Sequence, residues 1–126
     1  MAAYQAQNKK VSSCKCGPDY IDPMFHKEVL GVDSKNLDLF FSSEDELRKE
    51  YAKHAADAEL VITEGVMGYY DGMRLDSVTA SSYDVARTLD IPAVLILPCK
   101  GAALSLCAVA AGLYPFKKTA IFRGSF

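Results

Sequence analysis

Runs of strand length alternate along the chain with stretches of helical periodicity. The runs lie at residues 11–16 (VSSCKC), 59–63 (ELVIT) and 93–97 (AVLIL), and the last of them is apolar at every position. An unbroken apolar run of this length is typical of a strand that is covered on both faces. The pattern therefore predicts three strands, and TAIF at residues 119–122 is a candidate for the start of a fourth.

The stretches between these runs predict helices. Ser43 and Glu46 form a capping box at the start of one helix. The small or apolar residues on one face of that helix are Leu47, Tyr51, Ala52 and Ala55. A second helix is predicted near residues 82–89. Its buried face consists of Val85, Ala86 and Leu89. Residues 101–112 are rich in alanine and predict a closely packed helix, and residues 1–8 have the pattern of the end of a helix.

Alternating strands and helices favour a parallel sheet, because parallel neighbours need a crossover connection that is usually helical. We therefore expect an α/β fold, a doubly wound parallel sheet with helices on both faces, and residues 1–126 as one domain. In such sheets ligands bind beyond the carboxyl ends of the strands. The residues that follow each predicted strand are thus the first candidates for chemistry.

Charged side chains lie at the end of every predicted strand. Asp19 and Asp22 follow the first strand, which ends near Lys15; Glu64 follows the second and Lys100 the third. Carboxylates at strand ends are how phosphate-handling α/β proteins hold Mg²⁺, which keeps several waters and needs only one or two protein carboxylates. Lys15 is placed to neutralise charge on a transferred phosphoryl group.

A glycine-rich turn, EGVMGYYDG, occupies residues 64–72 and carries a further acid, Asp71. Glycine lets backbone N–H groups approach a ligand closely. The glycines of this turn are Gly65, Gly68 and Gly72.

The acidic candidates also have a purely structural interpretation. Asp19 and Asp22 neighbour Pro18 and Pro23, which predict a rigid turn, and aspartate side chains cap turns by accepting hydrogen bonds from backbone N–H groups. Turn capping and ligand binding carry equal weight for these two residues. Glu64 is alternatively the N-cap of a helix or a member of a surface ion pair.

Other conspicuous side chains are expected to be structural. His26 is predicted to be solvated or packed, and His54 to be solvated on a charged helix. Tyr69 and Tyr70 are predicted to pack, and Lys100 to be a solvated loop lysine.

Composition narrows the class of partner. Half of the 126 residues are hydrophobic, the net charge is −2 and the pI is near 5.6. No basic surface for nucleic acid or an anionic membrane is expected, and a small molecule is the favoured partner. No apolar run is long enough to span a bilayer, and we expect a cytoplasmic protein. The four cysteines lack the spacing of a zinc site and are predicted to be reduced thiols, buried or half-buried: Cys14, Cys16, Cys99 and Cys107.

Three motifs stand in order along the chain: KCGPDYIDPMFH at residues 15–26, NLDLFF at 36–41 and EGVMGYYDG at 64–72. In this order and at these separations they resemble the ATP-binding domain of the cobyrinate a,c-diamide synthases. The similarity continues through SSYDVARTLDIPAVLIL and KGAALSLCAVAAGL to about Lys118. It implies a P-loop NTPase-like fold similar to that of dethiobiotin synthetase.

The resemblance implies an ATP-dependent, glutamine-using amide ligase of cobalamin biosynthesis. ATP would phosphorylate the a and c acetate side chains of cobyrinate or hydrogenobyrinate in turn, and ammonia released from glutamine would displace the phosphate. The implied partners are a corrinoid or other tetrapyrrole, ATP with Mg²⁺ and the glutamine-derived ammonia. A homodimer is left open.

The resemblance also implies roles, residue by residue. Asp19 and Glu64 match the magnesium and phosphate positions, and Lys15 matches a lysine near the transferred group. The implied catalytic residues are Lys15, Asp19, Asp22 and Glu64. The substrate side comprises Tyr20, Ile21, Asp22 and Asp71. The nucleotide side comprises Gly65 and Gly68.

Two parts of the family pattern do not occur in these 126 residues: the phosphate-binding GxxxxGK[ST] and the glutamine amidotransferase domain. We therefore expect a partial ATP-binding domain that has unpaired strand edges and an exposed apolar face and does not hydrolyse ATP alone. Pro98 and Cys99 depart from the more polar pair of relatives, which puts a role for Lys100 in doubt. Two alternatives stay open: a non-catalytic truncated remnant that binds or serves a structural role, and a,c-diamide synthesis on a nickel tetrapyrrole.

Overall fold

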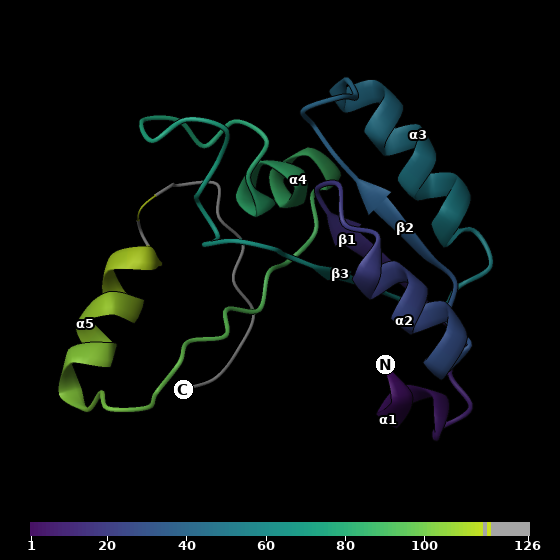
Figure 1. The fold of residues 1–126 in the computed structure, drawn as a ribbon, viewed down its shortest axis with the longest axis horizontal. Helices are drawn as coiled ribbons and strands as arrows, with labels where there is room; N and C mark the ends of the chain where they lie inside the picture. Colours follow the sequence, from purple (N-terminus) through teal and green to yellow (C-terminus); the bar gives the residue numbers. More distant parts are fainter. Residues whose placement is uncertain (115, 117–126) are drawn as a thin grey trace.

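The chain forms an α/β fold with a three-stranded parallel sheet in the order β2-β1-β3 (Figure 1). The computed structural model describes residues 1–114 and 116, so the strand candidate at 119–122 lies outside the described residues. The strands are β1 (Val11–Cys16), β2 (Ser34–Leu37) and β3 (Leu60–Glu64). The first and third confirm the predicted strands, whereas β2 was not predicted because its sequence, SKNL, is polar.

Five helices accompany the sheet in the described part of the chain. They are α1 (Ala2–Gln5), α2 (Ile21–Leu30), α3 (Glu44–Ala55), α4 (Ser82–Leu89) and α5 (Leu104–Leu113). The capping box at the start of α3 is formed as predicted, with the Ser43 side chain accepting from the Glu46 N–H and the Glu46 carboxylate accepting from the Ser43 N–H. The predicted second helix is α4, with the predicted bounds.

The prediction of a rigid turn around Pro18 and Pro23 was wrong in part, because α2 begins there. Pro23 lies in the first turn of α2, where its missing N–H costs no helical hydrogen bond. Gly17 makes the connection from β1 into α2 possible: its φ is +82°, and its N–H donates to the Leu37 carbonyl at 2.9 Å. The start of α2 is thereby held against the end of β2.

Helices cover both faces of the three-stranded sheet, as predicted. Alternate residues of β1 point to opposite faces. On one face Cys14 and Cys16 pack with residues of α3 and α4 in the apolar core, whose buried members also include Leu37, Leu47 and Val85. On the other face Ser13 contacts His26 of α2. The centre of the fold is therefore a strand with an apolar face and a polar face.

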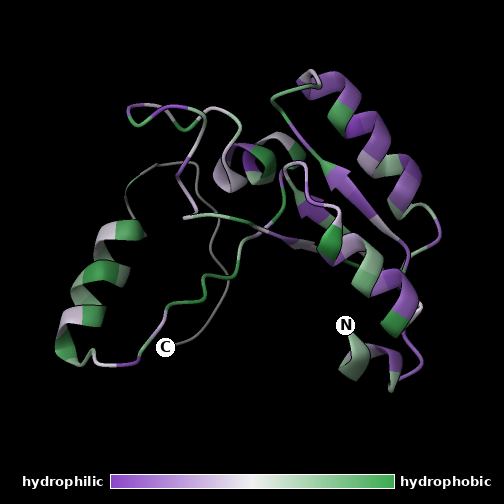
Figure 2. Cartoon of the chain, viewed as in Figure 1, coloured by the Kyte–Doolittle hydropathy of each residue, from purple (hydrophilic) through white to green (hydrophobic). Residues whose placement is uncertain are grey.

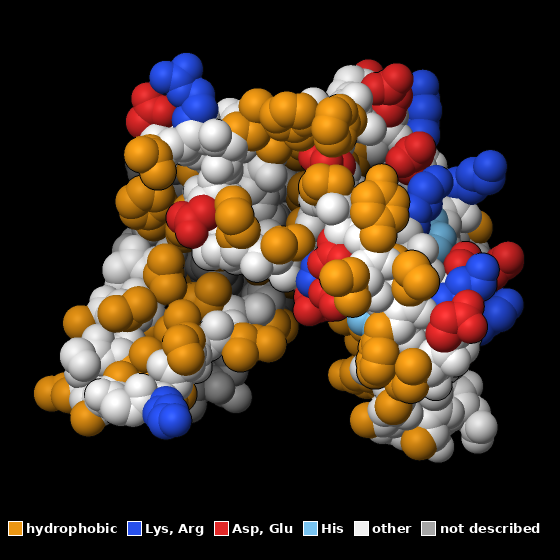
Figure 3. Space-filling model, in the orientation of Figure 1, with side chains coloured by type: hydrophobic (Ala, Val, Ile, Leu, Met, Phe, Trp, Pro, Cys, Tyr) orange, Lys and Arg blue, Asp and Glu red, His pale blue; other side chains and the backbone are white. Residues whose placement is uncertain are grey.

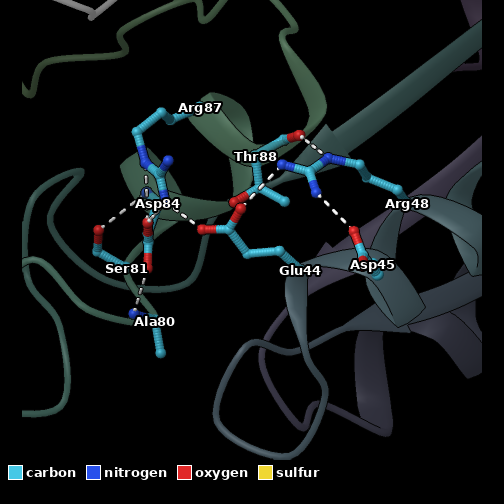
Figure 4. A network of polar contacts seen from close by, with 8 residues as sticks. All are labelled: Glu44, Asp45, Arg48, Ala80, Ser81, Asp84, Arg87 and Thr88. Atoms are coloured by element: carbon cyan, nitrogen blue, oxygen red, sulfur yellow. Dashed lines mark hydrogen bonds and ion pairs between the residues drawn. The ribbon is translucent and has the colours of Figure 1, made fainter.

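An ionic network joins α3 to α4 on the core side of the sheet (Figure 4). Arg87 of α4 donates to Glu44 of α3 and to Asp84 of its own helix, both at 2.7 Å. Arg48 of α3 donates to Glu44 at 2.8 Å and to the Thr88 carbonyl at 3.0 Å. The two helices are thus fixed against each other by charge as well as by the core.

The predicted strand at residues 93–97 is wrong: this segment belongs to no strand among the described residues. Val94 is 74% exposed and Ile96 is 89% exposed, so the segment is not covered on both faces either. An apolar pattern indicates a preference for burial but does not by itself determine secondary structure. The edge strands of the described sheet are β2 and β3.

The apolar helix α5 shares this exposure. It occupies most of the predicted helix at 101–112, but only its Ala110 is buried, so the expected close packing is wrong among the described residues. Figure 2 shows α5 as largely hydrophobic, whereas β1 and β2 include hydrophilic stretches. No described helix has the length and apolar character needed to cross a membrane.

Candidate functional site

Four of the predicted site residues meet at the carboxyl end of the sheet. Lys15, near the end of β1, is 4% exposed and lies opposite Glu64 in the register of β1 with β3. Its ammonium nitrogen is 2.5 Å from Asp22 Oδ2, 3.3 Å from Glu64 Oε1 and 3.7 Å from Asp19 Oδ2. Strand ends and the start of α2 therefore bring one lysine and three acids into a single cluster, which we call the Lys15 cluster.

The charges of the Lys15 cluster do not cancel. Burial disfavours the charged form of Lys15, but hydrogen bonds and charge from Asp22 and Glu64 outweigh it, so the pKa of Lys15 is raised. One ammonium faces three carboxylates. The cluster thus has more acidic than basic side chains.

Asp19 serves as a cap and as a member of the cluster. Its Oδ1 accepts hydrogen bonds from the N–H of Ile21 at 2.9 Å and of Asp22 at 3.3 Å, at the start of α2. Partial desolvation opposes ionisation, but these backbone hydrogen bonds and the charge of Lys15 lower the pKa of Asp19. The capping interpretation is therefore confirmed for Asp19, whereas the Asp22 carboxylate is directed at Lys15.

Glu64 is the last residue of β3, and its side chain is 46% exposed. The N-cap interpretation is wrong, because no helix begins at Glu64. Its ion pair is with the buried Lys15 rather than with a surface lysine. Its second oxygen, Oε2, faces the imidazole of His26 with 3.8 Å between Oε2 and Nε2.

Both histidines pack inside the fold, so the prediction of a solvated His54 was wrong. His26 is 6% exposed, and its Nδ1 lies 2.9 Å from Ser13 Oγ. The His54 side chain is 9% exposed, and its Nε2 lies 2.7 Å from Ser12 Oγ. Buried hydroxyls need hydrogen-bond partners. Two adjacent serines in a predicted strand were a signal that polar partners would be needed on both faces, but they did not indicate which side chains would supply them.

A cavity of about 700 Å³ opens beside the Lys15 cluster, beyond the carboxyl ends of the strands. Exposed apolar side chains from the three strand ends form most of its wall: Tyr20, Ile21, Phe40, Phe41, Val66, Met67 and Met73. On the face drawn in Figure 3, hydrophobic side chains cover much of the surface between α4 and α2, with acidic side chains among them. Such a concentration of exposed apolar surface is typical of a binding site.

The predicted site residues divide between the cavity and the cluster. Asp19 belongs to both, and it reaches the cavity together with the predicted substrate residues Tyr20, Ile21 and Asp71. Lys100 lies in an exposed turn and takes part in neither.

The glycines of the 64–72 turn, which include the predicted nucleotide-binding residues Gly65 and Gly68, lie close to other residues of the chain on the side where a Cβ would project. A Cβ on Gly65 would lie 2.7 Å from Ser82 Oγ, and one on Gly68 would collide with the Asp71 carboxylate. A Cβ on Gly72 would lie 2.7 Å from the Ser77 carbonyl oxygen. Backbone packing therefore accounts for glycine at position 72, whereas at Gly65 and Gly68 the neighbouring atoms belong to side chains, and a role of these two toward a nucleotide stays a prediction. Tyr69 and Tyr70 stack around Tyr83, with ring centroids 5.9 and 5.2 Å away, as predicted for packing residues.

Asp38 is an acid that the prediction missed. It follows β2 and lines the cavity, with one carboxylate oxygen accepting from the Phe40 N–H at 2.8 Å and the other buried without a hydrogen-bond partner. The signal was present in NLDLFF, where an acid precedes an aromatic pair. It was missed because the strand before it was not predicted, so Asp38 was not recognised as a strand-end residue.

The cysteines are free but not uniformly buried. Cys14 and Cys16 are buried, and desolvation raises the pKa of their thiols to about 12 and about 11. Cys99 and Cys107 are exposed, so the prediction of burial was wrong for these two.

The carboxylates of the Lys15 cluster suit Mg²⁺ only if the protein supplies one or two of its ligands and water or phosphate supplies the others. Carboxylate oxygens are the ligands that Mg²⁺ prefers. Among residues 1–114 and 116, however, no group of three or more acidic, histidine or cysteine side chains is arranged around a common metal position. Asp19 uses one oxygen as a cap and is 24% exposed, whereas the Glu64 side chain is 46% exposed, which makes Glu64 the more solvent-accessible of the two carboxylates.

Comparison with known proteins adds to this geometry. No family model matches the chain, and no solved structure matches it. Fold and site together define an α/β protein with a charged cluster and an apolar cavity at the carboxyl ends of parallel strands.

The chain is homologous to a segment of the cobyrinate a,c-diamide synthases. It is 42% identical over 116 residues to that of Synechococcus sp., which covers 92% of this chain and 25% of the relative. It is 40% identical over 121 residues to that of Clostridium tetani, with 96% and 27% covered. The Methanocaldococcus jannaschii synthase is 35% identical over 119 residues, with 93% and 27% covered. The chain thus spans about a quarter of the length of these relatives.

Proposed function

We propose that this chain supplies part of the site of an ATP-dependent, glutamine-using amide ligase. In this proposal the ligase amidates the a and c acetate side chains of cobyrinate or hydrogenobyrinate in cobalamin biosynthesis. The observation that carries the proposal is the meeting of Lys15, Asp19, Asp22 and Glu64 at one end of the sheet. The similarity to cobyrinate a,c-diamide synthases supports the choice of substrate.

The reaction proceeds in two steps that need little covalent chemistry from the protein. An acetate oxygen of the substrate attacks the γ-phosphorus of ATP, the bond to the bridging oxygen breaks, and ADP leaves. Ammonia then adds to the acyl carbon and loses a proton, and the bond from that carbon to the phosphate oxygen breaks. Because a carboxylate is a poor electrophile until it carries phosphate, positioning and charge neutralisation dominate catalysis.

Lys15 has the charge that these steps need. Its ammonium is fixed by three acids and shielded from solvent, so it keeps its proton and needs no reorganisation as charge develops on the transferred phosphoryl group. Asp22 holds that ammonium at the shortest distance, and it faces the substrate in the proposal.

Magnesium balances the remaining negative charge in this proposal. A polyanionic nucleotide and a polycarboxylate substrate are repelled by the excess acids of the Lys15 cluster, and a divalent cation removes that repulsion. Glu64 and Asp19 would hold the ion, with Glu64 as the principal ligand because its carboxylate is the more solvent-accessible. The P-loop NTPase-like architecture belongs to the same proposal.

The cavity would receive the macrocycle. Its wall is mainly apolar, which suits the face of a large ring, and Asp19 and Asp71 place polar groups at its lining. Tyr20 and Ile21 are 75% and 79% exposed and border the Lys15 cluster in sequence, so a ring that covers them gains apolar burial next to the reacting groups.

A non-catalytic binding role is the second candidate. The cavity and the cluster are both formed within the described residues. A chain with this combination would bind a macrocycle without turning over ATP. Amidation of a nickel tetrapyrrole would use the same groups and differs only in the ring that the cavity accepts.

The test is a chimera in which the aligned residues of this chain replace the matched segment of the Synechococcus synthase. We expect the chimera to form cobyrinate a,c-diamide from cobyrinate, ATP and glutamine. Glu64→Gln should lower kcat/KM by about 10²-fold and raise the Mg²⁺ requirement, because it removes the charge of the proposed metal ligand. Asp22→Asn should impair amidation more than ATP binding.

Glu59→Gln is the matched control. Glu59 directly precedes β3, the strand that ends at Glu64, and it forms an ion pair with Lys9 far from the Lys15 cluster. It should leave the rate unchanged. Unchanged activity of the Glu64→Gln chimera would contradict the proposed role of Glu64. A chimera that binds cobyrinate but forms no amide would favour the binding role, and one that amidates only a nickel tetrapyrrole would favour that substrate.

A further inference from the structure

His26 connects a buried serine pair to an acid of the Lys15 cluster. Its Nδ1 lies 2.9 Å from Ser13 Oγ and 3.3 Å from Ser34 Oγ, and the two hydroxyl oxygens are 2.7 Å apart. Its Nε2 lies 3.8 Å from Glu64 Oε2. The ring comes from α2, whereas the serines belong to β1 and β2 and the acid to β3. One buried imidazole therefore lies within hydrogen-bond distance of side chains from β1 and β2 and faces an acid of β3.

These contacts favour one tautomer of the ring. If Ser34 donates to Ser13 and Ser13 donates to Nδ1, the neutral imidazole carries its proton on Nε2, directed at Glu64. The opposite tautomer would place the Nε2 lone pair against a carboxylate, which is unfavourable.

The two oxygens of Glu64 then have different partners. Oε1 lies 3.3 Å from the Lys15 ammonium, and Oε2 faces the Nε2 of His26. A glutamate that is 46% exposed has several accessible rotamers, and a single ion pair at one oxygen would leave the carboxylate free to turn. At 3.8 Å the Nε2–H of His26 acts on the other oxygen by charge–dipole attraction rather than by a hydrogen bond, and this attraction favours the orientation in which Oε2 faces the ring.

We propose that His26 is a positioning residue for Glu64: it holds the Glu64 carboxylate in one orientation beside Lys15, ready for the cation that this acid binds in the proposed function. Cation binding by Glu64 rests on the proposed function, whereas the orientation of Glu64 does not. His26 touches neither nucleotide nor substrate in this account, and it acts only through Glu64.

His54 provides a matched control inside the same chain. Its Nε2 contacts Ser12 Oγ at 2.7 Å, and its Nδ1 lies 3.8 Å from Asp33 Oδ2. It therefore repeats the arrangement of serine, imidazole and carboxylate, but its acid is 82% exposed and has no ion pair with Lys15. Substitution of His54 therefore removes a buried histidine that does not face an acid of the Lys15 cluster, whereas substitution of His26 removes one that does.

The first experiment measures the orientation of Glu64 without a metal. In the isotope-labelled 126-residue chain, three-bond couplings of Glu64 should report one dominant rotamer, and long-range ¹H–¹⁵N spectra should show His26 protonated at Nε2. His26→Asn keeps an amide near Nδ1 but has no donor at the Nε2 position, so the Glu64 couplings should become averaged. His26→Gln places an amide donor near the Nε2 position and should restore one rotamer, while His54→Gln should change nothing at Glu64.

The second experiment uses Mn²⁺ as the probe and measures its binding to the same variants by electron paramagnetic resonance. We expect His26→Asn to weaken Mn²⁺ binding about 3- to 10-fold, and His26→Gln and His54→Gln to stay within about twofold of the unchanged chain. Amide spectra of each variant check that it is folded.

The outcomes separate the two proposals. Averaged Glu64 couplings in the unchanged chain, a proton on Nδ1 of His26, or equal behaviour of His26→Asn and His54→Gln would overturn the role of His26. If Glu64→Gln leaves Mn²⁺ binding intact, the metal role of Glu64 in the proposed function fails. In that case the Glu64 couplings still decide the positioning role of His26.

Discussion

Two segments of strand length differ in burial and in secondary structure. β1, VSSCKC, contains two serines and a lysine, yet it is the central strand, and five of its six residues are buried. Residues 93–97, AVLIL, are wholly apolar, yet they form no strand among the described residues and leave Val94 and Ile96 exposed. Hydrophobicity alone would have predicted the reverse order of burial.

The difference lies in what each segment can contact. β1 has a parallel neighbour on each side, and its polar side chains meet His54, His26 and the acids around Lys15. Every buried polar group on its two faces thus has a partner, which removes most of the cost of burial. Residues 93–97 include an isolated bridge residue, Ala93, but contribute no strand to the described sheet. Burial in a sheet therefore depends on available partners as much as on apolar composition.

Of the substitutions considered, truncation of a core side chain should lower the free energy of unfolding the most. Leu37 at the end of β2 is 1% exposed, so Leu37→Ala should lower the free energy of unfolding by about 2–4 kcal/mol through lost burial and a cavity. Ile96→Ala, at an 89% exposed position in the apolar segment, should change it by less than about 0.5 kcal/mol. Urea unfolding followed by circular dichroism measures both, and equal losses would contradict the contrast.

Alkaline pH should destabilise the fold through the thiols of β1. The pKa values of Cys14 and Cys16 are raised from 9.0 to about 12 and about 11, so the unfolded chain loses these protons at lower pH than the folded chain. This contribution is complete below about pH 9 and is lost as pH rises from about 9 toward 12, at a cost on the order of 2–3 kcal/mol for each thiol by pH 11.

Urea unfolding between pH 7 and 11 tests this sign. A chain with Cys14→Ala and Cys16→Ala should lose less stability over this range than the unchanged chain. The matched control, Cys99→Ala with Cys107→Ala, removes exposed thiols and should leave the slope unaltered. Identical slopes for both double variants would contradict the thiol assignment.

The ionic network between α3 and α4 should have the smallest effect. The Arg87 and Arg48 guanidinium groups lower the pKa of Glu44, so Glu44→Gln should lower the urea midpoint slightly at low salt. The difference should shrink at high salt, because exposed ion pairs are screened. Glu50→Gln is the control, because the Glu50 pair with Lys35 is longer, at 3.8 Å. A salt-independent loss for Glu44→Gln would show that its role is not electrostatic.

The fold was predictable where local signals and tertiary packing agree. The capping box located the start of α3, and periodicity located α4 and β1. The polar β2 was not predictable, because the sequence SKNL has no strand pattern of its own and is stabilised as a strand by pairing with β1. The start of α2 was hidden by Pro23, which is compatible with a first helical turn as well as with a loop.

The site was predictable to the extent that it depends on strand ends. Expecting chemistry at carboxyl ends brought Lys15, Asp19, Asp22 and Glu64 together before any coordinates. His26 was not assigned a role, because the distance from a helix to a serine pair and an acid depends on tertiary packing. Asp38 was missed together with the strand that precedes it, so one error in the fold became an error in the site.

The central claim is that the carboxyl end of the sheet binds a macrocycle, while the exposed apolar segment 93–113 does not. Titration of the ¹⁵N-labelled chain with cobyrinate in the presence of Mg²⁺ tests this most directly. We expect saturable amide shifts at residues 17–21, 38–41 and 66–73, and none at 93–113. Shifts confined to 93–113, or shifts that never saturate, would mean that exposed apolar surface alone attracts the ring and would contradict the claim.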